Sequence, residues 1–259
     1  MSNSIAVIKI GGNVIDDTVK LTAFLQDFSK LKGPKILIHG GGKKSSQFSK
    51  EIGLTPTMHQ GRRITDAATL DVVTMVYAGL INKNIVAQLQ SLGCNALGMS
   101  GADGNAIQSV KRNHPEIDFG FVGDVEKVNT DFIQTQLSQG ITPVFCAITH
   151  NKKGQLLNTN ADTIASEVAA SLSNAFEVVL HYCFEKKGVL QSVEDNDSVI
   201  PFIDTTSYKT LLDSGIIADG MLPKLKNCFD ALNKGVQSVN IGLPAMINNA
   251  SYPRTQIKL

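Results

Sequence analysis

The amino-acid sequence predicts an α/β protein, a three-layer αβα sandwich with a central, mostly parallel sheet and two lobes. Short apolar segments of strand length alternate along the chain with segments whose apolar residues recur at helical spacing. The first apolar segment, residues 5–10, is apolar at almost every position, which is typical of a strand buried on both faces of a parallel sheet. At 259 residues, the chain is long enough to bury a large core.

The chain begins with a strand–helix–strand unit. Residues 5–10 are its first expected strand, and residues 19–31 carry apolar side chains at helical spacing. Gly33-Pro34 ends this helix, and residues 36–38 form the centre of the second expected strand. For such a βαβ unit we expect a right-handed crossover.

Two glycine-rich turns follow these two strands. Gly11-Gly12 comes directly after the first, and Gly40-Gly41-Gly42 comes after the second, just before a helix that should start near Ser45. A glycine turn between a strand and a helix exposes backbone N–H groups at the positive end of the helix dipole, so it can hold an anion. A single triplet is more often an ordinary turn, but the presence of two such turns favours an anion site.

The longest helical pattern in the chain runs from Thr65, its expected N-cap, to about Leu92. Its apolar residues form a wide stripe, which in most proteins simply packs into the core. Because the stripe is so extensive, we also consider this helix a candidate subunit interface.

The alternation of strands and helices continues through the middle of the chain. Residues 94–99 and 141–148 are further expected strands, although Pro143 favours the start of a strand or a sheet edge. Residues 105–135 are mixed and partly hairpin-like. A helix should then begin next to Asp162.

Asn174 marks the expected boundary between the two lobes, residues 1–174 and residues 175–259. Thr205 or Thr206 is expected to cap a helix in the second lobe. Another helix should begin at Pro223. The expected strands of this lobe are residues 176–180, 236–241 and 255–259.

Composition argues against several classes of protein. Lys and Arg total 24 and Asp and Glu 23, and a net charge of +1 gives no reason to expect nucleic acid or an anionic membrane as partner. No apolar run approaches the ~20 residues of a membrane-spanning helix, and the N-terminus lacks the basic region and cleavage site of a secretory signal. We therefore expect a cytoplasmic protein. Its scattered cysteines fit reduced, buried thiols: Cys94, Cys146, Cys183 and Cys228.

Three charged residues occupy unusual positions. Lys9 lies within the buried first strand, where a lysine is costly unless its amine reaches water or an anion. Lys224 follows Pro223 in the first turn of a helix, where the dipole disfavours a cation. Asp162, taken alone, is most simply a helix-capping feature. The two lysines and the two glycine turns together suggest a shared anion.

Motifs for other chemistries are incomplete. Gly42-Lys43-Lys44-Ser45 is similar to the end of a Walker A loop, but its serine is one position too late and the upstream glycine is missing. The five histidines show no metal-ligand spacing, and there is no G-x-S-x-G motif.

Five segments nevertheless occur in the order and spacing typical of one family. They are I-K-I-G-G (8–12), H-G-G-G-K (39–43), G-R-R-I-T-D-A (61–67), L-N-T-N-A-D (157–162) and D-G-M-L-P-K (219–224). In these segments the sequence resembles the amino acid kinase family over nearly its whole length. Each motif is weak alone, but the ordered set is specific.

The resemblance implies a catalytic group and a nucleotide site. Lys9 and Lys224 would stabilise the transferring phosphoryl group, and Asp162 would fix these two lysines. The implied phosphate- and nucleotide-binding residues are Gly11, Gly12, Gly40, Tyr182, Gly188, Asp219, Gly220 and Met221.

The resemblance also implies an acceptor site and a reaction. Arg63 would clamp the α-carboxylate of the acceptor, Asn158 would bind its acylamino group, and Gly41 and Gly42 would hold it from the turn. The implied reaction transfers a phosphoryl group from ATP to the γ-carboxylate of an N-acyl-L-glutamate, giving an acyl phosphate in arginine biosynthesis. Mg²⁺ would be carried by ATP, without a metal site in the protein.

The residue chemistry agrees with this reaction. Phosphoryl transfer depends mostly on alignment and on the placement of charge. The acceptor carboxylate, with a reference pKa of about 4.3, is already ionised at neutral pH and needs no general base. Residues 1–174 would then form the acyl-amino-acid-binding and dimerisation lobe, and residues 175–259 the nucleotide-binding lobe.

Three departures from the family pattern stand out. Residues 181–188 replace the usual T-D-x-x-G-type loop, and Arg254-Thr255 replaces a G-T pair, so the nucleotide contacts should differ. Arg62 stands where leucine is commoner. It could serve a larger, more acidic acyl group such as succinyl in place of acetyl, or it could be a solvated surface arginine.

Two other functions remain open, and the assembly is an expectation. Another family activity, on aspartate, glutamate, carbamate or UMP, would keep the lysines and change the acceptor clamp. A non-catalytic relative would have no need of the trio Lys9, Asp162 and Lys224. Because the first strand starts within a few residues of Met1, we expect no N-terminal helix of the kind that builds arginine-inhibited hexamers in this family, and hence a homodimer without arginine feedback.

Overall fold

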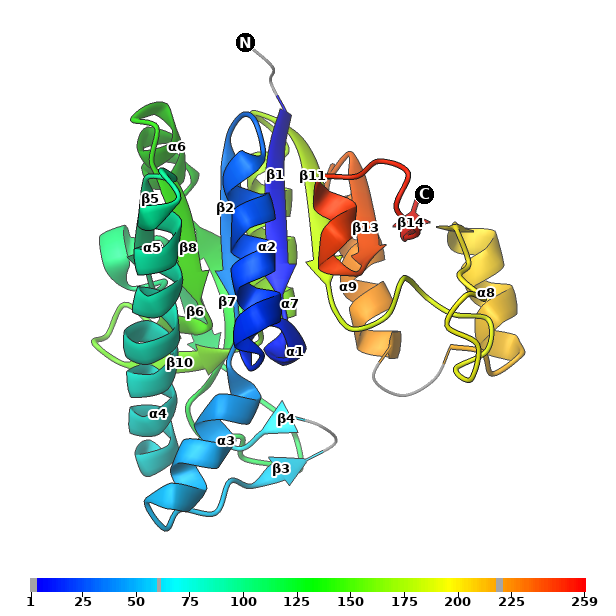
Figure 1. Ribbon diagram of the computed structural model, residues 1–259. Coiled ribbons are helices and arrows are strands. Elements are labelled where there is room, and N and C mark those ends of the chain that lie inside the picture. Colours follow the sequence, from blue (N-terminus) through cyan, green and yellow to red (C-terminus); the bar gives the residue numbers. More distant parts are fainter. Residues whose placement is uncertain (1–3, 60–61, 218–220) are drawn as a thin grey trace.

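The computed structural model describes residues 4–59, 62–217 and 221–259. These residues form a central eight-stranded sheet in the order β12-β14-β13-β11-β1-β2-β8-β5 (Figure 1). Every neighbouring pair is parallel except β13 and β14, which are antiparallel. The strands are β1 (Ser4–Ile10), β2 (Lys35–His39), β5 (Ala96–Met99), β8 (Thr142–Cys146), β11 (Glu177–Cys183), β12 (Phe202–Ile203), β13 (Ser238–Gly242) and β14 (Thr255–Ile257).

Helices cover both faces of this sheet, which gives the three predicted layers. On one face, α2 (Thr18–Lys30) packs beside α5 (Asn82–Ser91), and α5 lies against β5 and β8. On the other face, α7 (Ala161–Leu172) lies against β1, β2 and β11 and packs beside α9 (Met221–Asn233). Figure 1 shows α2 in front of the sheet and α7 behind it. The predicted α/β sandwich with a mostly parallel sheet is therefore confirmed.

Two smaller sheets lie beside the main one. Four strands close on themselves in the order β10-β7-β6-β9, and β6 and β7 form the antiparallel hairpin expected within residues 105–135. β3 and β4 form a short antiparallel pair next to α3 (Figure 1). Their bounds are β3 (Met58–His59), β4 (Arg62–Arg63), β6 (Ile107–Lys111), β7 (Val122–Val128), β9 (Ile148–His150) and β10 (Leu156–Thr159). The remaining helices are α1 (Gly12–Ile15), α3 (Gly42–Glu51), α4 (Ala67–Thr74), α6 (Thr130–Ser138) and α8 (Thr205–Asp213), with 3₁₀ turns at Asp103–Asn105 and Pro244–Ile247.

The register of the central strands brings both glycine turns to one sheet edge. β1 pairs in parallel with β2 and β11, and Ile10 at its end lies opposite His39 and Cys183. The chain leaves β1 at Gly11 and leaves β2 at Gly40. Two turns that are far apart in the sequence thus lie side by side at the carboxyl ends of the strands, where open α/β sheets bind their ligands.

The long helix expected from Thr65 to Leu92 is continuous from residue 67 to residue 91, but it has three parts. A π-helical segment, Met75–Ile81, separates α4 from α5. Thr65 was expected to cap this helix, and that assignment is wrong by one residue: the side chain of Asp66 accepts the bond from the Thr69 N–H at 2.8 Å. Likewise, Asp204, and neither Thr205 nor Thr206, caps α8 through a capping box with Ser207.

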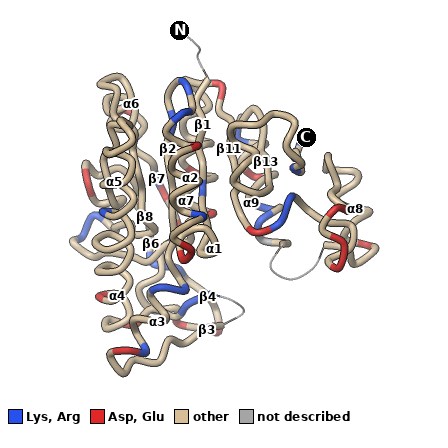
Figure 2. Tube along the Cα trace, in the orientation of Figure 1, with Lys and Arg blue, Asp and Glu red and all other residues tan. Residues whose placement is uncertain are grey.

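Ala67–Ser91 is long and apolar enough to cross a membrane by length and composition. However, 44% of its most apolar window is buried inside the fold, against the sheet and its neighbouring helices. A helix that packs into a protein core has the same length and apolar composition, so these two features are weak evidence for a membrane span. Basic and acidic residues are scattered over the whole molecule and do not gather on one face (Figure 2).

Candidate active site

A cleft of about 470 Å³ opens at the carboxyl ends of β1 and β2. It is lined by ten of the residues that the sequence singled out, from five separate segments of the chain. These residues are Lys9, Gly11, Gly12, Gly40, Gly41, Gly42, Arg63, Asn158, Asp162 and Lys224. The structure therefore brings the acceptor-binding, phosphate-binding and catalytic candidates to one place.

The centre of the cleft is an ion triad. Lys9 Nζ lies 2.7 Å from Asp162 Oδ1, and Lys224 Nζ lies 3.2 Å from Asp162 Oδ2. The three side chains are between 12% and 19% exposed, so water screens them only in part. Burial alone would raise the pKa of the Asp162 carboxyl, but attraction to Lys9 and Lys224 outweighs burial and holds that pKa well below its ordinary value. Asp162 is an anion at any physiological pH.

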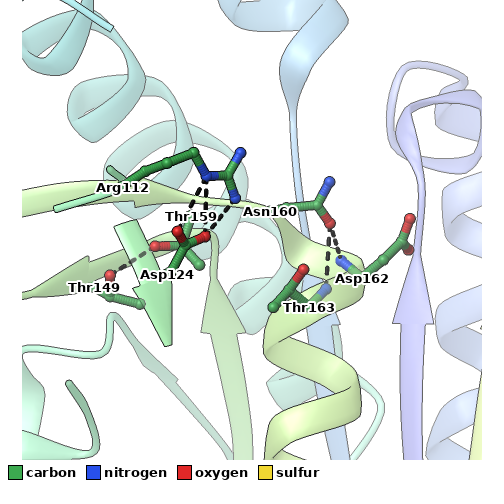
Figure 3. A network of polar contacts seen from close by, with 7 residues as sticks. All are labelled: Arg112, Asp124, Thr149, Thr159, Asn160, Asp162 and Thr163. Carbon is green, nitrogen blue, oxygen red and sulfur yellow. Dashed lines mark hydrogen bonds and ion pairs between the residues drawn. The ribbon is translucent and has the colours of Figure 1, made fainter. Parts of the chain in front are cut away.

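Asp162 itself is placed by the start of α7. Asn160 is the N-cap, and its side chain accepts hydrogen bonds from the backbone N–H groups of Asp162 and Thr163 at 2.7 and 3.2 Å. The cap is Asn160, so Asp162 is free for another role. Figure 3 shows its carboxylate directed away from α7, towards the strand that carries Lys9.

Aromatic rings hold Lys224 over the cleft. Its Nζ lies 5.6 Å from the ring centre of Tyr182 and 5.8 Å from that of Phe184, within the range of cation–π attraction. The Tyr182 hydroxyl donates to the backbone oxygen of Asp162 at 2.9 Å. Burial raises the pKa of Tyr182 well above its ordinary value, so this hydroxyl keeps its proton.

His39, the last residue of β2, fixes the glycine triplet. The sequence did not predict this role. Burial lowers the pKa of His39 to about 4, so the ring is neutral at physiological pH. Its Nδ1 donates to the Gly40 carbonyl at 2.8 Å, and its Nε2 accepts from the Asn82 amide at 3.0 Å. Asn82 also donates to the Val144 carbonyl. These two hydrogen bonds require the proton on Nδ1 of the neutral ring. The hydrogen-bond series Asn82–His39–Gly40 therefore holds the glycine turn in one orientation.

Arg63 lies at the far end of the triplet. Its Nη2 donates to the Gly42 carbonyl at 2.9 Å and to Ser46 Oγ at 2.6 Å. Its Nη1 is buried and has no hydrogen-bond partner within the described parts of the chain. A buried guanidinium donor without a partner is costly, so Nη1 is suited to an anion in the cleft. Asn158 donates to Thr65 Oγ1 at 3.0 Å and faces the same space.

Several lining residues had no sequence signal. Tyr77 belongs to the π-helical segment, and Arg112 forms a two-donor ion pair with Asp124 (Figure 3). Helical periodicity and family motifs identified neither residue. Arg62, noted for its unusual charge, also lines the cleft. The other residues of this group are Met58, Val122, Ala147, Thr163 and Asn227.

Other nucleotide-binding candidates are placed outside this cleft or are not described. Tyr182 supports the triad from the core with a 1% exposed side chain, so its ring does not line the cleft. Gly188 is buried, and a side chain there would meet Thr255 Oγ1 at 2.6 Å. Met221 is half-buried at the first turn of α9. Asp219 and Gly220 lie outside the described residues.

Among the residues that the structure describes, no group of three or more His, Cys, Asp or Glu side chains is arranged to hold a metal ion. The cleft offers cationic side chains and backbone N–H groups, which suit phosphate oxygens.

The model of the amino acid kinase family matches residues 4–242. The chain belongs to the amino acid kinase family. Among its relatives, the acetylglutamate kinase of Cytophaga hutchinsonii is 57% identical over 236 residues, which cover 91% of this chain and 89% of that protein. The acetylglutamate kinase of Phocaeicola vulgatus is 51% identical over 251 residues, which cover 97% and 98% of the two chains.

A solved structure of another protein supports the fold. The N-acetylglutamate synthase from Neisseria gonorrhoeae, complexed with coenzyme A and N-acetyl-glutamate, superposes with a TM-score of 0.83. The match covers 100% of this chain and 60% of that chain at 21% identity. At this identity the comparison bears on the architecture alone.

The ion triad leads to a prediction about stability and pH. The pKa of Asp162 is lower in the folded protein than in the unfolded chain. Its contribution to the free energy of unfolding is therefore complete above the ordinary pKa near 3.8 and is lost only as the pH falls through the lower folded value. Asp162→Asn leaves two ammonium groups facing each other, and we expect a loss of roughly 1–3 kcal/mol in the free energy of unfolding. Urea unfolding should show the same loss at pH 5, 6.5 and 8.

Glu167→Gln is the matched control, since Glu167 on the same helix pairs with Lys234 at the surface. Its loss should stay below about 1 kcal/mol. A loss at Asp162 that shrinks steadily from pH 8 to pH 5 would mean that its carboxylate takes up a proton in that range, against the account given above.

Proposed function

We propose that this protein is an ATP-dependent phosphotransferase that phosphorylates the γ-carboxylate of N-acetyl-L-glutamate to an acyl phosphate, a step of arginine biosynthesis. The observation that carries the proposal is the convergence of Lys9, Asp162 and Lys224 at a cleft that also contains two glycine turns and Arg63. The names of the relatives from C. hutchinsonii and P. vulgatus support the same acceptor.

Recognition of the acceptor would use the side of the cleft formed by α3, β4 and β10. Arg63 Nη1, which is buried without a partner in the described structure, would bind the α-carboxylate. The Asn158 amide would bind the acylamino group. Backbone N–H groups of the first turn of α3 are also available, because its N-cap Gly41 has no side chain to satisfy them.

Transfer of the phosphoryl group would take place between the two lysines. The acceptor carboxylate and the terminal phosphate of ATP are both anions, so their approach has to be offset by fixed positive charge. Lys9 from β1 and Lys224 from α9 provide two ammonium groups, and Asp162 holds both of them. Since the acceptor is already ionised, none of these residues has to remove a proton. Mg²⁺ bound to ATP would neutralise further phosphate charge.

The lobe assignment forms part of the same proposal. Residues 1–174 would bind the acyl amino acid, and residues 175–259 would bind the nucleotide beside Lys224. Gly11, Gly12 and Gly40 would contact the phosphates, and Asp219, Gly220 and Met221 would contact the nucleotide. Tyr182 and Gly188 would shape the nucleotide side from within the fold.

We further propose a cytoplasmic homodimer. The helical segment of residues 67–91, the residue that caps its C-terminus and the neighbouring strand β5 expose large apolar side chains that a second copy could cover. These are Met75, Leu80, Leu92 and Leu97, all between 40% and 54% exposed.

A second acceptor, N-succinyl-L-glutamate, is favoured by one observation. Arg62 lines the cleft and forms no ion pair within the described residues, whereas Arg112, which lines the same cleft, is paired with Asp124. Arg62 is therefore available to a carboxylate at the far end of a longer acyl group.

The first test of the proposal is a coupled ADP-release assay with and without each acceptor. N-acetyl-L-glutamate should stimulate release more than aspartate, carbamate or UMP. Lys9→Met and Lys224→Met should each lower kcat by roughly 10²–10³-fold, because each removes a charge that faces the transferred group. Lys226→Met, an exposed lysine on α9, is the matched control and should keep normal turnover. Full turnover in both active-site variants, or a stronger response to aspartate, carbamate or UMP, would contradict the proposal.

The acyl group can be decided by comparing kcat/KM for N-acetyl- and N-succinyl-L-glutamate. If Arg62 binds the distal carboxylate, Arg62→Leu should reduce kcat/KM for the succinyl substrate by about tenfold and change the acetyl value much less. Arg62→Lys should retain part of the succinyl activity. The same preference in the wild type and in Arg62→Leu would exclude a role for this residue.

A further inference from the structure

The π-helical segment Met75–Ile81 lies directly beneath the glycine triplet. Short π-helical segments within α-helices often occur at functional sites, because the extra residue in the turn changes which side chains face a neighbour. Two side chains of this segment, Tyr77 and Ile81, are only 5% and 6% exposed. Both point at Gly41.

The contact with Gly41 is too close for any other residue. A Cβ atom at position 41 would lie 2.4 Å from Ile81 Cδ1 and 2.9 Å from Tyr77 Cδ1. The bare backbone of Gly41 therefore rests on the Tyr77 ring. With the ring packed on Gly41, the Tyr77 hydroxyl lies near Ser45 in the first turn of α3.

The hydroxyl of Tyr77 has only a weak bond there. It lies 3.3 Å from Ser45 Oγ, whereas hydroxyl–hydroxyl bonds are usually about 2.7–2.8 Å long. Ser45 Oγ already donates to the Gly42 carbonyl at 3.0 Å, so Tyr77 is the donor in this contact. A donor held by such a long bond can turn towards a better acceptor in the cleft.

Arg63 reaches the same point from the other side. A Cβ atom at Gly42 would lie 4.0 Å from the Tyr77 hydroxyl and 4.0 Å from Arg63 Nη2, and these are its nearest contacts apart from its chain neighbours and the backbone of α3 itself. The missing side chain of Gly42 thus leaves a small space between two donors that both line the cleft. The neighbouring Arg63 Nη1 is buried and has no partner in the described parts of the chain. Hydrogen-bond donors surround this space, which suits a carboxylate.

We propose that the Tyr77 hydroxyl is a second donor, beside Arg63, to the carboxylate of the acceptor that does not react. Tyr77 is then a substrate-binding residue that contributes to acceptor specificity, and the π-helical segment is what places it. The inference deepens the proposed function, since it concerns the α-carboxylate of the same acceptor. It requires that loss of the hydroxyl weakens binding only when that carboxylate is present.

Isothermal titration calorimetry tests this without any turnover. The ligands are N-acetyl-L-glutamate and its α-carboxamide analogue, which keeps the γ-carboxylate. Tyr77→Phe preserves the ring that packs on Gly41 and removes only the hydroxyl. We expect the Kd of N-acetyl-L-glutamate to rise about tenfold or more in this variant, and that of the carboxamide to rise by less than about threefold.

The control variant is Tyr252→Phe, which removes a hydroxyl outside the cleft and should change neither Kd. Thermal unfolding of each variant shows whether the fold is intact. Equal weakening for the two ligands, or no weakening of N-acetyl-L-glutamate, would overturn the role of Tyr77. Absence of turnover by a wild-type protein that still binds the acceptor would instead count against the kinase reaction, and the two failures can be told apart.

Discussion

The ion pair network around Asp162 is the interaction on which the rest of the site depends. One carboxylate holds two ammonium groups, Lys9 at 2.7 Å and Lys224 at 3.2 Å, from elements more than 50 residues distant in the sequence on either side. Without Asp162, the two lysines would repel each other across a half-buried cleft. With it, one net positive charge remains at the point where the carboxyl ends of β1 and β2 expose backbone N–H groups. The site is therefore prepared for an anion before any ligand arrives.

The fold supplies this arrangement through the register of the sheet. Parallel pairing of β1 with β2 and β11 aligns Ile10, His39 and Cys183, so that both glycine turns emerge together and Tyr182 comes to lie beneath α7. Hydrogen bonds as well as apolar packing hold the residues of the cleft in place. His39 and Asn82 fix the Gly40 carbonyl, and the Tyr182 hydroxyl fixes the backbone of Asp162. A cleft supported in this way can align two anionic substrates with little rearrangement, which is what phosphoryl transfer needs from a protein.

Much of this could be predicted from the sequence, and the misses have physical reasons. A continuous apolar strand with one lysine, followed by glycines, is a strong local signal, so β1, β2 and Lys9 were predictable from pattern alone. The role of Asp162 was not predictable from pattern alone, because a carboxylate at a helix start is usually a cap. The family motif gave its role, and the structure shows that Asn160 is the cap.

The π-helical segment could not be predicted, since its apolar stripe has helical spacing like its neighbours. The hydrogen bonds of His39 and the burial of Tyr182 depend on tertiary contacts. Helix and strand periodicity carries no information about such contacts. Thr65 was taken for a cap because Ser, Thr, Asp and Asn are all good caps, and the choice between Thr65 and the adjacent Asp66 depends on backbone geometry.

The most direct test of the central claim is a crystal structure with a non-hydrolysable ATP analogue, Mg²⁺ and N-acetyl-L-glutamate bound together. The account predicts that Lys9 Nζ and Lys224 Nζ both lie about 3 Å from oxygens of the terminal phosphate, with the Asp162 carboxylate between them. A complex in which one of the two lysines faces a different cavity, away from the phosphate, would contradict it.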